Sequence, residues 1–505
     1  MTSDALPDWL AYRAAATPER IALVAEGRGW TFAEYDAAAE RVARRLVTLG
    51  ARDGRVATLL RNGSAAAVLV HAAPRAAATL VPLNVRLAEA ELAWQLDDVG
   101  ARLLVAHGAT AALAGSVRAL RPDLAIVSAD DGGAAALDVP RLDDVAADPG
   151  PLRLEHPLDA VHTVVYTSGT TGTPKGAMLT VGNHWWSAVG SALNLGLRDD
   201  DRWLACLPLF HVGGQAIVLR SAIQGTVAVV HDGFDEHAVN RAIDDEGATI
   251  VSVVAAMLQR MLDARVDRRY PPTLRCVLLG GGPAPRSLLE RCARLGAPVA
   301  QTYGLTESAS QVATLAPADA LGKLGAAGKA LYPNALRVVD AGGRDVAAGE
   351  AGEIVVRGPV VTAGYVGRPA DTARALAGGW LRTGDVGTLD ADGYLHVLDR
   401  RDDLVVTGGE NVYPAEVEAA LLAHPAVAEA GVVGLPDARW GARVVAAVLP
   451  RPGATLDAET LRAHCRTLVA AYKVPAEIRL VADPLPRTAS GKLRRGELRR
   501  LWAAE

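Results

Sequence analysis

Residues 166–176 read Tyr166-Thr167-Ser168-Gly169-Thr170-Thr171-Gly172-Thr173-Pro174-Lys175-Gly176, and they follow an apolar, β-branched run from Val161 to Val165. That run predicts a buried strand. The glycines let a ligand approach the backbone closely, and N–H groups in such a turn can form a concave anion site. The hydroxyls and Lys175 add donors and a positive charge. The stretch therefore predicts a loop that holds a polyphosphate beside a buried strand.

The spacing of this loop differs from that of the Walker-type loop, which has four residues between its first glycine and Gly-Lys. Here the pattern is Gly169-x-x-Gly172-x-x-Lys175-Gly176. A flexible linker is the alternative interpretation, because runs of Gly, Ser and Thr are common in linkers. A linker has no reason to follow a buried strand and to end in Pro-Lys-Gly, so we favour phosphate binding.

The composition limits the class of protein. A chain of 505 residues predicts two to four domains or subdomains. A net charge of −5 provides no basic field for nucleic acid or an acidic membrane. No apolar run reaches about 18 residues, so no spanning helix is expected, and the first 13 residues do not resemble a secretory signal.

The cysteines and lysines are few. Cys206, Cys276, Cys292 and Cys465 form no C-x-x-C pair, so we expect buried free thiols in a reducing compartment, the cytoplasm, without disulfide or zinc. The chain contains five lysines. Each is therefore of interest: Lys175, Lys323, Lys329, Lys473 and Lys492.

The first 150 residues alternate between helical and strand patterns. Thr31 and Glu34 form a capping-box pattern, which predicts a helix ending at Leu49 before Gly50. Further elements are predicted at 56–60 (strand), 87–99 (helix) and 103–106 (strand). This alternation favours parallel α/β layers. Residues 130–155 are rich in Asp, Gly, Pro and Ala and are predicted to be irregular.

The middle of the chain continues the α/β pattern. A helix is predicted at 183–197, and residues 207–215 read as strand, turn and helix start. Strands are predicted at 250–254, 274–279 and 299–302. A glycine cluster at 280–285 and Tyr303-Gly304-Leu305-Thr306-Glu307 follow the last two strands. The carboxyl ends of parallel strands are where open α/β sheets bind ligands.

From Gly352 onward the pattern changes to short strands and turns, predicted at 353–357 and 394–398. A charge cluster, Arg400-Arg401-Asp402-Asp403, follows. The pattern then restarts with helices at 414–423 and 457–471 and strands at 430–434, 443–449 and 477–481. We predict a large domain at 1–399 and a compact α+β domain at 400–505, with the linker at 399–403. A solvated turn is the alternative interpretation of the charge cluster.

Five stretches in order resemble those of the acyl-adenylate-forming enzymes, which include acyl-CoA synthetases, peptide-synthetase adenylation domains and beetle luciferases. They span roughly residues 20–495 and comprise Thr167–Gly176, Tyr303–Glu307, Tyr365 with Trp380–Asp385, Asp399 through Asn411, and Pro486–Lys492. The resemblance implies a large N-terminal domain of layered α/β subdomains with a small β-barrel-like region. A small, mobile α+β domain would follow. It also implies ATP, Mg²⁺ and, in the CoA ligases, coenzyme A.

The resemblance implies roles for the matched residues. The phosphates would be held by Thr167, Ser168, Gly169, Thr170, Thr171, Gly172 and Lys175. The adenine would be enclosed by Gly280, Gly281, Gly282, Pro283, Tyr303 and Gly304, and the ribose would be bound by Asp385 with Arg400. Glu307 would bind Mg²⁺, and Thr306 would contact the α-phosphate. Asp402 falls at the hinge, and Lys492 would be the catalytic lysine.

The chemistry agrees with these roles. A carboxylate must attack the α-phosphorus in line against a polyanion, so positioning and charge neutralisation carry the catalysis. The small domain of this family rotates between the two half-reactions, first inserting the lysine and then opening a thiol channel. A hinge of a few residues is sufficient for such a motion.

One longer stretch, Asn183-His184-Trp185-Trp186-Ser187-Ala188 through Asn194-Leu195-Gly196-Leu197, resembles the o-succinylbenzoate–CoA ligases of menaquinone synthesis. Their substrate has two carboxylates, of which one is activated and the other must be recognised. A cation suits that task, and we predict Arg220, although an arginine reaching the surface is the alternative. His211 would lie near the reacting carboxylate or be a core histidine. Gly213, Gly214 and Thr302 would form the pocket wall.

Other functions remain open at this point. The nearest is a ligase for a fatty, aryl or malonic acid. An amino-acid adenylation domain is less favoured, because His211 stands where those proteins place an aspartate. A non-catalytic nucleotide-binding regulator is disfavoured by the set Lys175, Glu307, Asp385 and Lys492. Members of the family are often homodimers, but no apolar stripe marks an interface.

Overall fold

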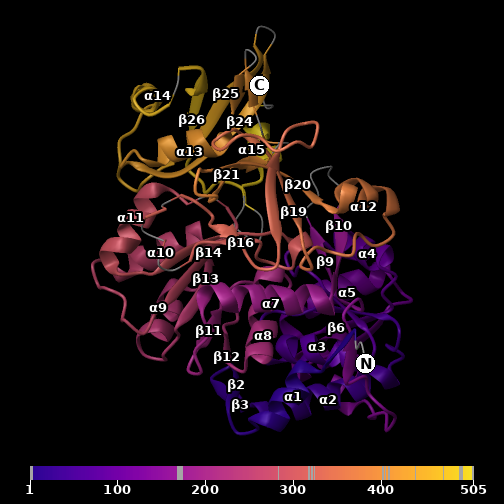
Figure 1. The fold of residues 1–505 in the computed structure, drawn as a ribbon. Coiled ribbons are helices and arrows are strands. Elements are labelled where there is room, and N and C mark those ends of the chain that lie inside the picture. Colours follow the sequence, from indigo (N-terminus) through magenta and orange to yellow (C-terminus); the bar gives the residue numbers. More distant parts are fainter. Residues whose placement is uncertain are drawn as a thin grey trace.

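The computed structural model describes residues 4–167, 174–282, 284–316, 319, 322–323, 325–400, 403, 405–407, 410–437, 440–469, 471–487 and 493–502. Two large sheets with helices form the lower part of the molecule in Figure 1, and a small α+β unit lies at the top. The predicted fold class is confirmed. Among the described residues, no helix is long and apolar enough to cross a membrane.

The first large sheet has the strand order β10-β9-β5-β4-β6-β7. Its strands are β4 (Arg55–Leu59), β5 (Thr79–Pro82), β6 (Leu103–Ala106), β7 (Ala125–Ser128), β9 (Val161–Thr167) and β10 (Lys175–Thr180). β9 and β10 pair antiparallel, and the other pairings are parallel. The strands predicted at 56–60, 103–106 and 161–165 are thus confirmed to within a residue or two at each end.

The second large sheet has the order β17-β16-β15-β14-β13-β11-β12-β2-β3. It comprises β2 (Ile21–Ala25), β3 (Arg28–Thr31), β11 (Arg202–Ala205), β12 (Val227–Val230), β13 (Ile250–Val254), β14 (Cys276–Gly280), β15 (Val299–Tyr303), β16 (Ala313–Thr314) and β17 (Lys329–Ala330). From β2 to β15 the pairings are parallel. The N-terminal strand β2 lies beside β12, far from it in sequence.

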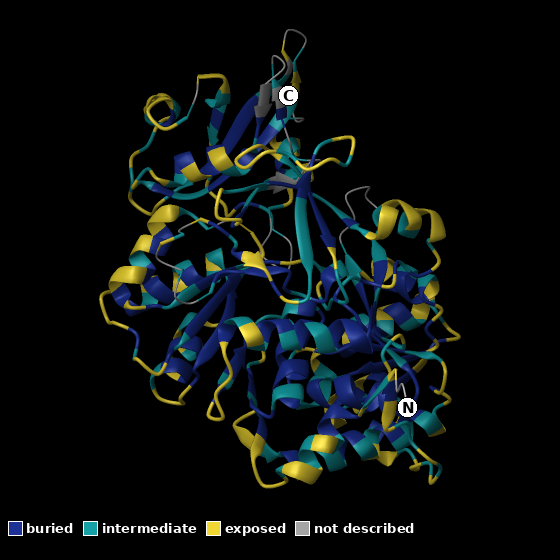
Figure 2. Cartoon of the chain, viewed as in Figure 1, coloured by how far each residue is buried: buried dark blue, intermediate teal, exposed yellow. Residues whose placement is uncertain are grey.

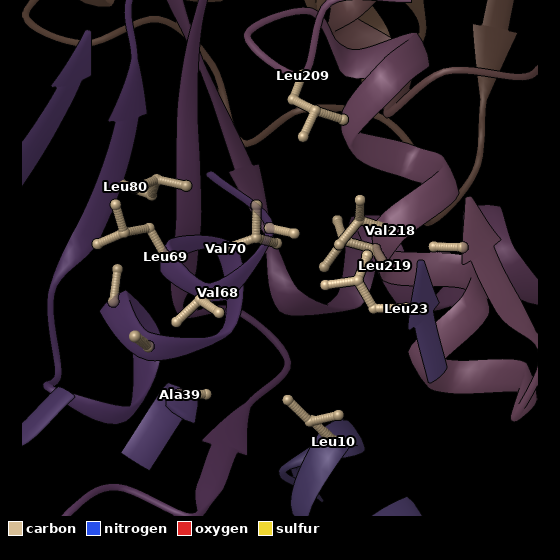
Figure 3. Close-up of a cluster of buried hydrophobic side chains, with 14 of the residues drawn as sticks. Leu10, Leu23, Ala39, Val68, Leu69, Val70, Leu80, Leu209, Val218 and Leu219 are labelled. Carbon is tan, nitrogen blue, oxygen red and sulfur yellow. The ribbon is translucent and has the colours of Figure 1, made fainter. Parts of the chain in front are cut away.

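Side-chain alternation along the strands produces a layered molecule. In β11, Trp203 and Ala205 join the large core between the two sheets, whereas Leu204 joins the core on the other face. The inner layer contains α1 (Trp9–Ala16), α2 (Phe32–Thr48), α3 (Ser64–Arg75), α7 (Val181–Leu195) and α8 (Val212–Gln224). Figure 3 shows Leu69, Leu80 and Val218 in this inner core, and Figure 2 shows α8 almost wholly buried.

Two outer helical layers complete the large domain. α4 (Glu89–Asp98), α5 (Ala111–Leu120) and α6 (Asp131–Leu137) cover the first sheet, and α9 (Glu236–Asp244), α10 (Ala255–Arg265) and α11 (Arg286–Leu295) cover the second.

The capping box of α2 is present as predicted, with Thr31 and Glu34 bonded reciprocally. The prediction of an irregular 130–155 is wrong for α6, because the Asp130 carboxylate accepts from Gly133 N–H and caps that helix.

The strand predicted within 207–215 is also wrong. β11 ends at Ala205, and no strand forms at 207–211. Pro208 has no N–H to donate, and the backbone on either side bonds to a side chain instead: Asn62 donates to Leu207 O and accepts from Leu209 N–H. This segment leads into α8 with His211 at its N-cap.

A smaller antiparallel sheet and the C-terminal unit follow. The sheet has β18 (Ala335–Val339), β19 (Gly352–Arg357), β20 (Leu381–Leu389) and β21 (Leu395–Arg400), flanked by α12 (Pro369–Ala375). The C-terminal unit contains β22 (Val405–Thr407), β23 (Glu410–Val412), α13 (Pro414–Leu422), β24 (Val427–Asp437), β25 (Gly441–Pro450), α14 (Ala458–Arg466), β26 (Glu477–Leu480) and α15 (Arg495–Arg499), around its own core. The predicted domain boundary at 399/400 falls on the last residues of β21.

The thiols are as expected. All four cysteines are buried and free. Burial raises the pKa of Cys206 and Cys276 to about 12, so both thiols are protonated at neutral pH.

Candidate active site

The predicted phosphate loop joins two antiparallel strands. Thr167 at the end of β9 is paired with Lys175 at the start of β10, and residues 168–173 between them lie outside the described part of the chain. The Lys175 Nζ is 3.1 Å from Asp371 Oδ1 and 5.4 Å from the centre of the Tyr365 ring. The hydrogen bond from Lys175 lowers the pKa of Asp371, which therefore stays ionised.

Residues 362–366 run alongside β10 and bring Tyr365 to this hairpin. Met178 N–H donates to Gly364 O at 2.9 Å, and Val366 N–H donates to Gly176 O at 2.9 Å. The Tyr365 hydroxyl donates to Glu307 Oε1 at 2.9 Å. The structure therefore brings the predicted phosphate-binding Lys175, over the ring, and the predicted metal-binding Glu307, at the hydroxyl, to one tyrosine.

Glu307 lies in a tight turn that follows β15. Gly304 begins the turn, and a Cβ there would lie 1.5 Å from Ser310 O, so only glycine fits. A 3₁₀ turn, η3 (Thr306–Ser308), follows. Ala309 and Ser310 then have φ of 49° and 100°, a left-handed backbone that costs a non-glycine residue roughly 1–3 kcal/mol. The surrounding contacts must supply that energy.

Tyr303 and Asp385 form the predicted nucleoside side of the site. Both are buried, and the Tyr303 hydroxyl donates to Asp385 Oδ2 at 2.7 Å. Asp385 on β20 is paired with Arg400 on β21. At the end of β14, Gly281 has φ of 83°, and a Cβ would lie 2.9 Å from a Val254 methyl carbon. The two ends of the predicted adenosine site are thus provided by β14–β15 and β20–β21.

The residues predicted to lie around the acid pocket also make close contacts within the fold. A Cβ on Gly214 would lie 2.4 Å from Pro208 O, so this glycine lets α8 begin against the preceding segment. The Thr302 hydroxyl donates to Ala313 O and lies 2.7 Å from the Thr314 hydroxyl. The His211 ring lies 4.7 Å from that of Phe210.

Arg220 does not reach the surface. It is 2% exposed, it donates from Nη2 to Ser187 Oγ at 3.0 Å, and its guanidinium lies 5.4 Å from the Trp203 ring centre. No carboxylate of the described residues lies within 4.0 Å of it. Burial lowers the pKa of Arg220 to about 9. The alternative of a surface-reaching arginine is therefore wrong.

The sequence did not predict a group of polar side chains on α7. Asn183 donates to Pro359 O and Val361 O at 2.8 and 2.9 Å, which fixes the segment that leads to Tyr365. His184 Nε2 lies 2.9 Å from Thr163 Oγ1 on β9, and Ser187 donates to Ala309 O at 2.7 Å. All three are buried. The signal in the sequence that could have identified these residues is the recurrence of polar residues on one face of an otherwise apolar helix.

Several predicted residues lie outside the described part of the chain, or have a described backbone only. The first group is Ser168, Gly169, Thr170, Thr171, Gly172, Pro283, Asp402 and Lys492, and the second is Arg400. Thr306 and Gly282 are described, at the start of η3 and just after β14.

The layered α/β fold, with a lysine on the β9–β10 hairpin and a carboxylate in the turn after β15 that contact the same tyrosine, is that of the AMP-binding enzymes. The chain belongs to this family: the AMP-binding enzyme model matches residues 10–366, and the AMP-binding enzyme C-terminal domain model matches residues 416–492.

Several close relatives are ligases that join 2-succinylbenzoate to CoA. A 2-succinylbenzoate–CoA ligase of Geobacillus kaustophilus (strain HTA426) is 52% identical over 497 residues, covering 98% of each chain, and one of Bacillus cereus (strain ATCC 14579) is 44% identical over 502 residues, covering 99% of each. The solved o-succinylbenzoate CoA synthetase of Bacillus subtilis in complex with its acyl-adenylate intermediate is 41% identical, with a TM-score of 0.90 and 98% of each chain covered. Its complex with ATP and magnesium ion has a TM-score of 0.89, with 98% of this chain and 100% of that chain covered.

Proposed function

We propose that the chain is a 2-succinylbenzoate–CoA ligase of menaquinone biosynthesis. It converts 2-succinylbenzoate, ATP and CoA to 2-succinylbenzoyl-CoA, AMP and pyrophosphate through an acyl-adenylate. The observation that carries the proposal is the 52% identity to such a ligase along almost the whole length of both chains. The contacts of Lys175 and Glu307 with Tyr365, and of Asp385 with Tyr303 at the start of the turn that carries Glu307, support an adenylating site. The buried free thiols suit a reducing compartment, and we place the enzyme in the cytoplasm.

The residues suit a magnesium–ATP complex. Among the described residues, no group of three or more His, Cys, Asp or Glu side chains could form a metal cage. Mg²⁺ at phosphate-transfer sites typically needs only one or two carboxylates, because the substrate phosphates and water supply its other oxygens. Glu307 is half-buried and has one oxygen bonded to Tyr365, so its second oxygen suits that role. The metal would neutralise phosphate charge.

Side chains of the protein would position the phosphates, the ribose and the attacking carboxylate. Lys175 and the hydroxyls of the loop bind the β- and γ-phosphates, which leave as pyrophosphate. Asp385 accepts from the ribose hydroxyls, and Tyr303 orients that carboxylate through its 2.7 Å bond. Lys492 donates to the attacking carboxylate and to the α-phosphate. Preorganised donors of this kind stabilise the transition state without reorganising during the reaction.

Arg220 and His211 are our candidates for acid recognition. A buried cation with no carboxylate among its described neighbours gains most from a partner that the substrate supplies. We therefore assign the second carboxylate of 2-succinylbenzoate to Arg220. His211, at the start of the same helix, would lie toward the reacting carboxylate.

The test is a pyrophosphate-release assay across a panel of acids, with and without CoA. We expect the highest kcat/KM with 2-succinylbenzoate. A matched acid, 3-benzoylpropionate, keeps the ketone and the ring but has one carboxylate, and it should be a much poorer substrate. Fatty, aryl and malonic acids serve as the competing panel. Equal or better turnover of one of these acids would reject the assignment, and no pyrophosphate release with any acid would reject the ligase itself.

A further inference from the structure

Ser187 lies in the second turn of α7, is 4% exposed, and stands between two groups of different kinds. Its Oγ is 3.0 Å from Arg220 Nη2 and 2.7 Å from Ala309 O. A guanidinium can only donate and a carbonyl can only accept. The Ser187 oxygen must therefore accept from Arg220, and its hydrogen must point at Ala309 O. The cation thus fixes the direction of the hydroxyl.

Ala309 belongs to the turn that carries Glu307. Ala309 is fully buried, and both Ala309 and the half-buried Ser310 beside it have a left-handed backbone. Such a backbone persists only where neighbouring groups hold it. Within the turn, Ala309 N–H donates to Thr306 O at 3.1 Å. The Ser187 hydroxyl is the α7 group that holds the turn through the Ala309 carbonyl.

The position of Glu307 depends on this turn. Its backbone carbonyl accepts from Thr362 N–H at 2.8 Å, and its carboxylate accepts from the Tyr365 hydroxyl. Those two bonds hold Glu307 from the β10 side, whereas Ser187 holds the chain two residues later from the α7 side. If the bond from Ser187 to the Ala309 carbonyl is lost, the backbone of Ala309 can relax from its left-handed conformation to one with negative φ. The Glu307 carboxylate then moves with the turn.

We propose that Ser187 is a positioning residue for adenylate formation: its hydroxyl holds the left-handed turn at Ala309 and thereby sets the place of the Glu307 carboxylate. The inference rests on the proposed role of Glu307 as the magnesium-binding residue. Ser187 itself touches no reacting atom in this account. Because Arg220 orients the hydroxyl, the same contact links the acid-binding side of the site to the metal-binding side.

The test compares two serines of α7. Ser191 lies one helical turn further along, is 1% exposed, and its hydroxyl has no hydrogen-bond partner among the described residues. Ser187→Ala and Ser191→Ala therefore remove the same group from similar burial, and only the first breaks the bond to Ala309. Ser187→Thr keeps the hydroxyl and serves as the conservative rescue. Adenylation is measured as pyrophosphate release over a Mg²⁺ titration, and thioester formation is measured from supplied acyl-adenylate and CoA.

We expect Ser187→Ala to lower the rate of pyrophosphate release about tenfold, the effect of one buried hydrogen bond, and to raise the Mg²⁺ concentration needed for half-maximal rate. Thioester formation and the Ser191→Ala enzyme should stay close to wild type, and Ser187→Thr should recover most of the rate.

Equal losses in both half-reactions, equal losses in both alanine variants, or a change confined to the KM for the acid would overturn the proposal. If Ser187→Ala does not fold, the Mg²⁺ dependence of Ser187→Cys, a weaker donor of similar size, decides in its place. The wild-type acid panel tests the proposed function separately.

Discussion

The Arg220 guanidinium is buried between α7 and α8, where it contacts the Ser187 hydroxyl and the Trp203 ring. Burial lowers its pKa to about 9, so at neutral pH the group still carries its charge. Burying a charge without a partner is costly. A substrate carboxylate beside Arg220 would offset that cost and form charge-assisted hydrogen bonds, so the second carboxylate should contribute much of the binding free energy.

Arg220→Ala is expected to raise the KM for 2-succinylbenzoate by about 10- to 100-fold, since a hydrogen bond to a charged group contributes about 1.5–3 kcal/mol. The KM for ATP should hardly change. Steady-state kinetics with 3-benzoylpropionate provide the control, because this acid has no second carboxylate to lose. Arg220 would be removed from the acid site if both acids were affected equally.

At the residue scale, the sequence predicts the groups that belong to short motifs. Lys175, Glu307 and Asp385 each stand in a motif whose resemblance to the family implies a role, and these roles stay predictions. Ser187 could not be identified in this way, because its partner Ala309 lies 122 residues away. The same is true of Asp371, which forms an ion pair with Lys175 from another segment. Such partners are set by tertiary packing, which local patterns do not contain.

At the element scale, the elements with strong local signals are where the sequence places them. α2 has its capping box, and β13 spans the residues expected. The failures have local causes that a pattern misses: Asn62 bonds to the 207–209 backbone and replaces a strand, and Asp130 caps a short helix in a region of turn-like composition. The predicted phosphate loop joins two antiparallel strands, whereas the sequence indicated only the first of them.

The turn after β15 should tolerate no side chain at its first residue. Gly304→Ala places a Cβ 1.5 Å from Ser310 O, so the backbone that carries Thr306 and Glu307 must shift. We expect a loss of more than about 100-fold in pyrophosphate release, as when preorganised catalytic groups are displaced. Gly233→Ala is the control, because no atom lies within 4 Å of its added Cβ. Wild-type rates in Gly304→Ala would contradict this geometry.

At the scale of the whole molecule, three buried histidines make the stability of the fold depend on pH. His71, His162 and His184 are each at most 3% exposed. Burial lowers the pKa of His71 to about 4 and of His184 to about 3, and it lowers the pKa of His162 well below the ordinary value. Asp8, Arg75 and His156 lie close to this group and form buried ion pairs and hydrogen bonds of their own.

Acid should therefore destabilise the fold between about pH 6.5 and 4. Below pH 6.5 the unfolded chain binds protons at these histidines and the folded chain does not, so the free energy of unfolding falls as pH falls. Each histidine contributes up to about 1.4 kcal/mol per pH unit. Thermal unfolding at pH 7.5, 6.5 and 5.5 measures the trend. His162→Leu should flatten it and exposed His237→Leu should not; an unchanged slope in His162→Leu would reject the account.

The two predicted domains imply that the half-reactions can be separated. Lys492→Ala is expected to abolish acyl-adenylate formation, because it removes the cation at the attacking carboxylate and α-phosphate. The same variant should still convert supplied acyl-adenylate and CoA to thioester, since that step uses the other domain pose. Pyrophosphate release and thioester formation are measured in parallel. Loss of both steps to the same extent would contradict this division.

The place of β2 in the second sheet has a consequence for synthesis on the ribosome. Leu23 is fully buried, and its neighbour in the sheet is Ala228, which is translated 205 residues later. At about 5–20 residues per second, the first strand waits roughly 10–40 s for its partner. During that time the apolar strand β2 is paired only with β3, and its other edge is open. No strand pairing of the described residues joins segments further apart in sequence, so chaperones that bind nascent chains have a long opportunity at residues 21–31, the segment that becomes an edge of the finished sheet.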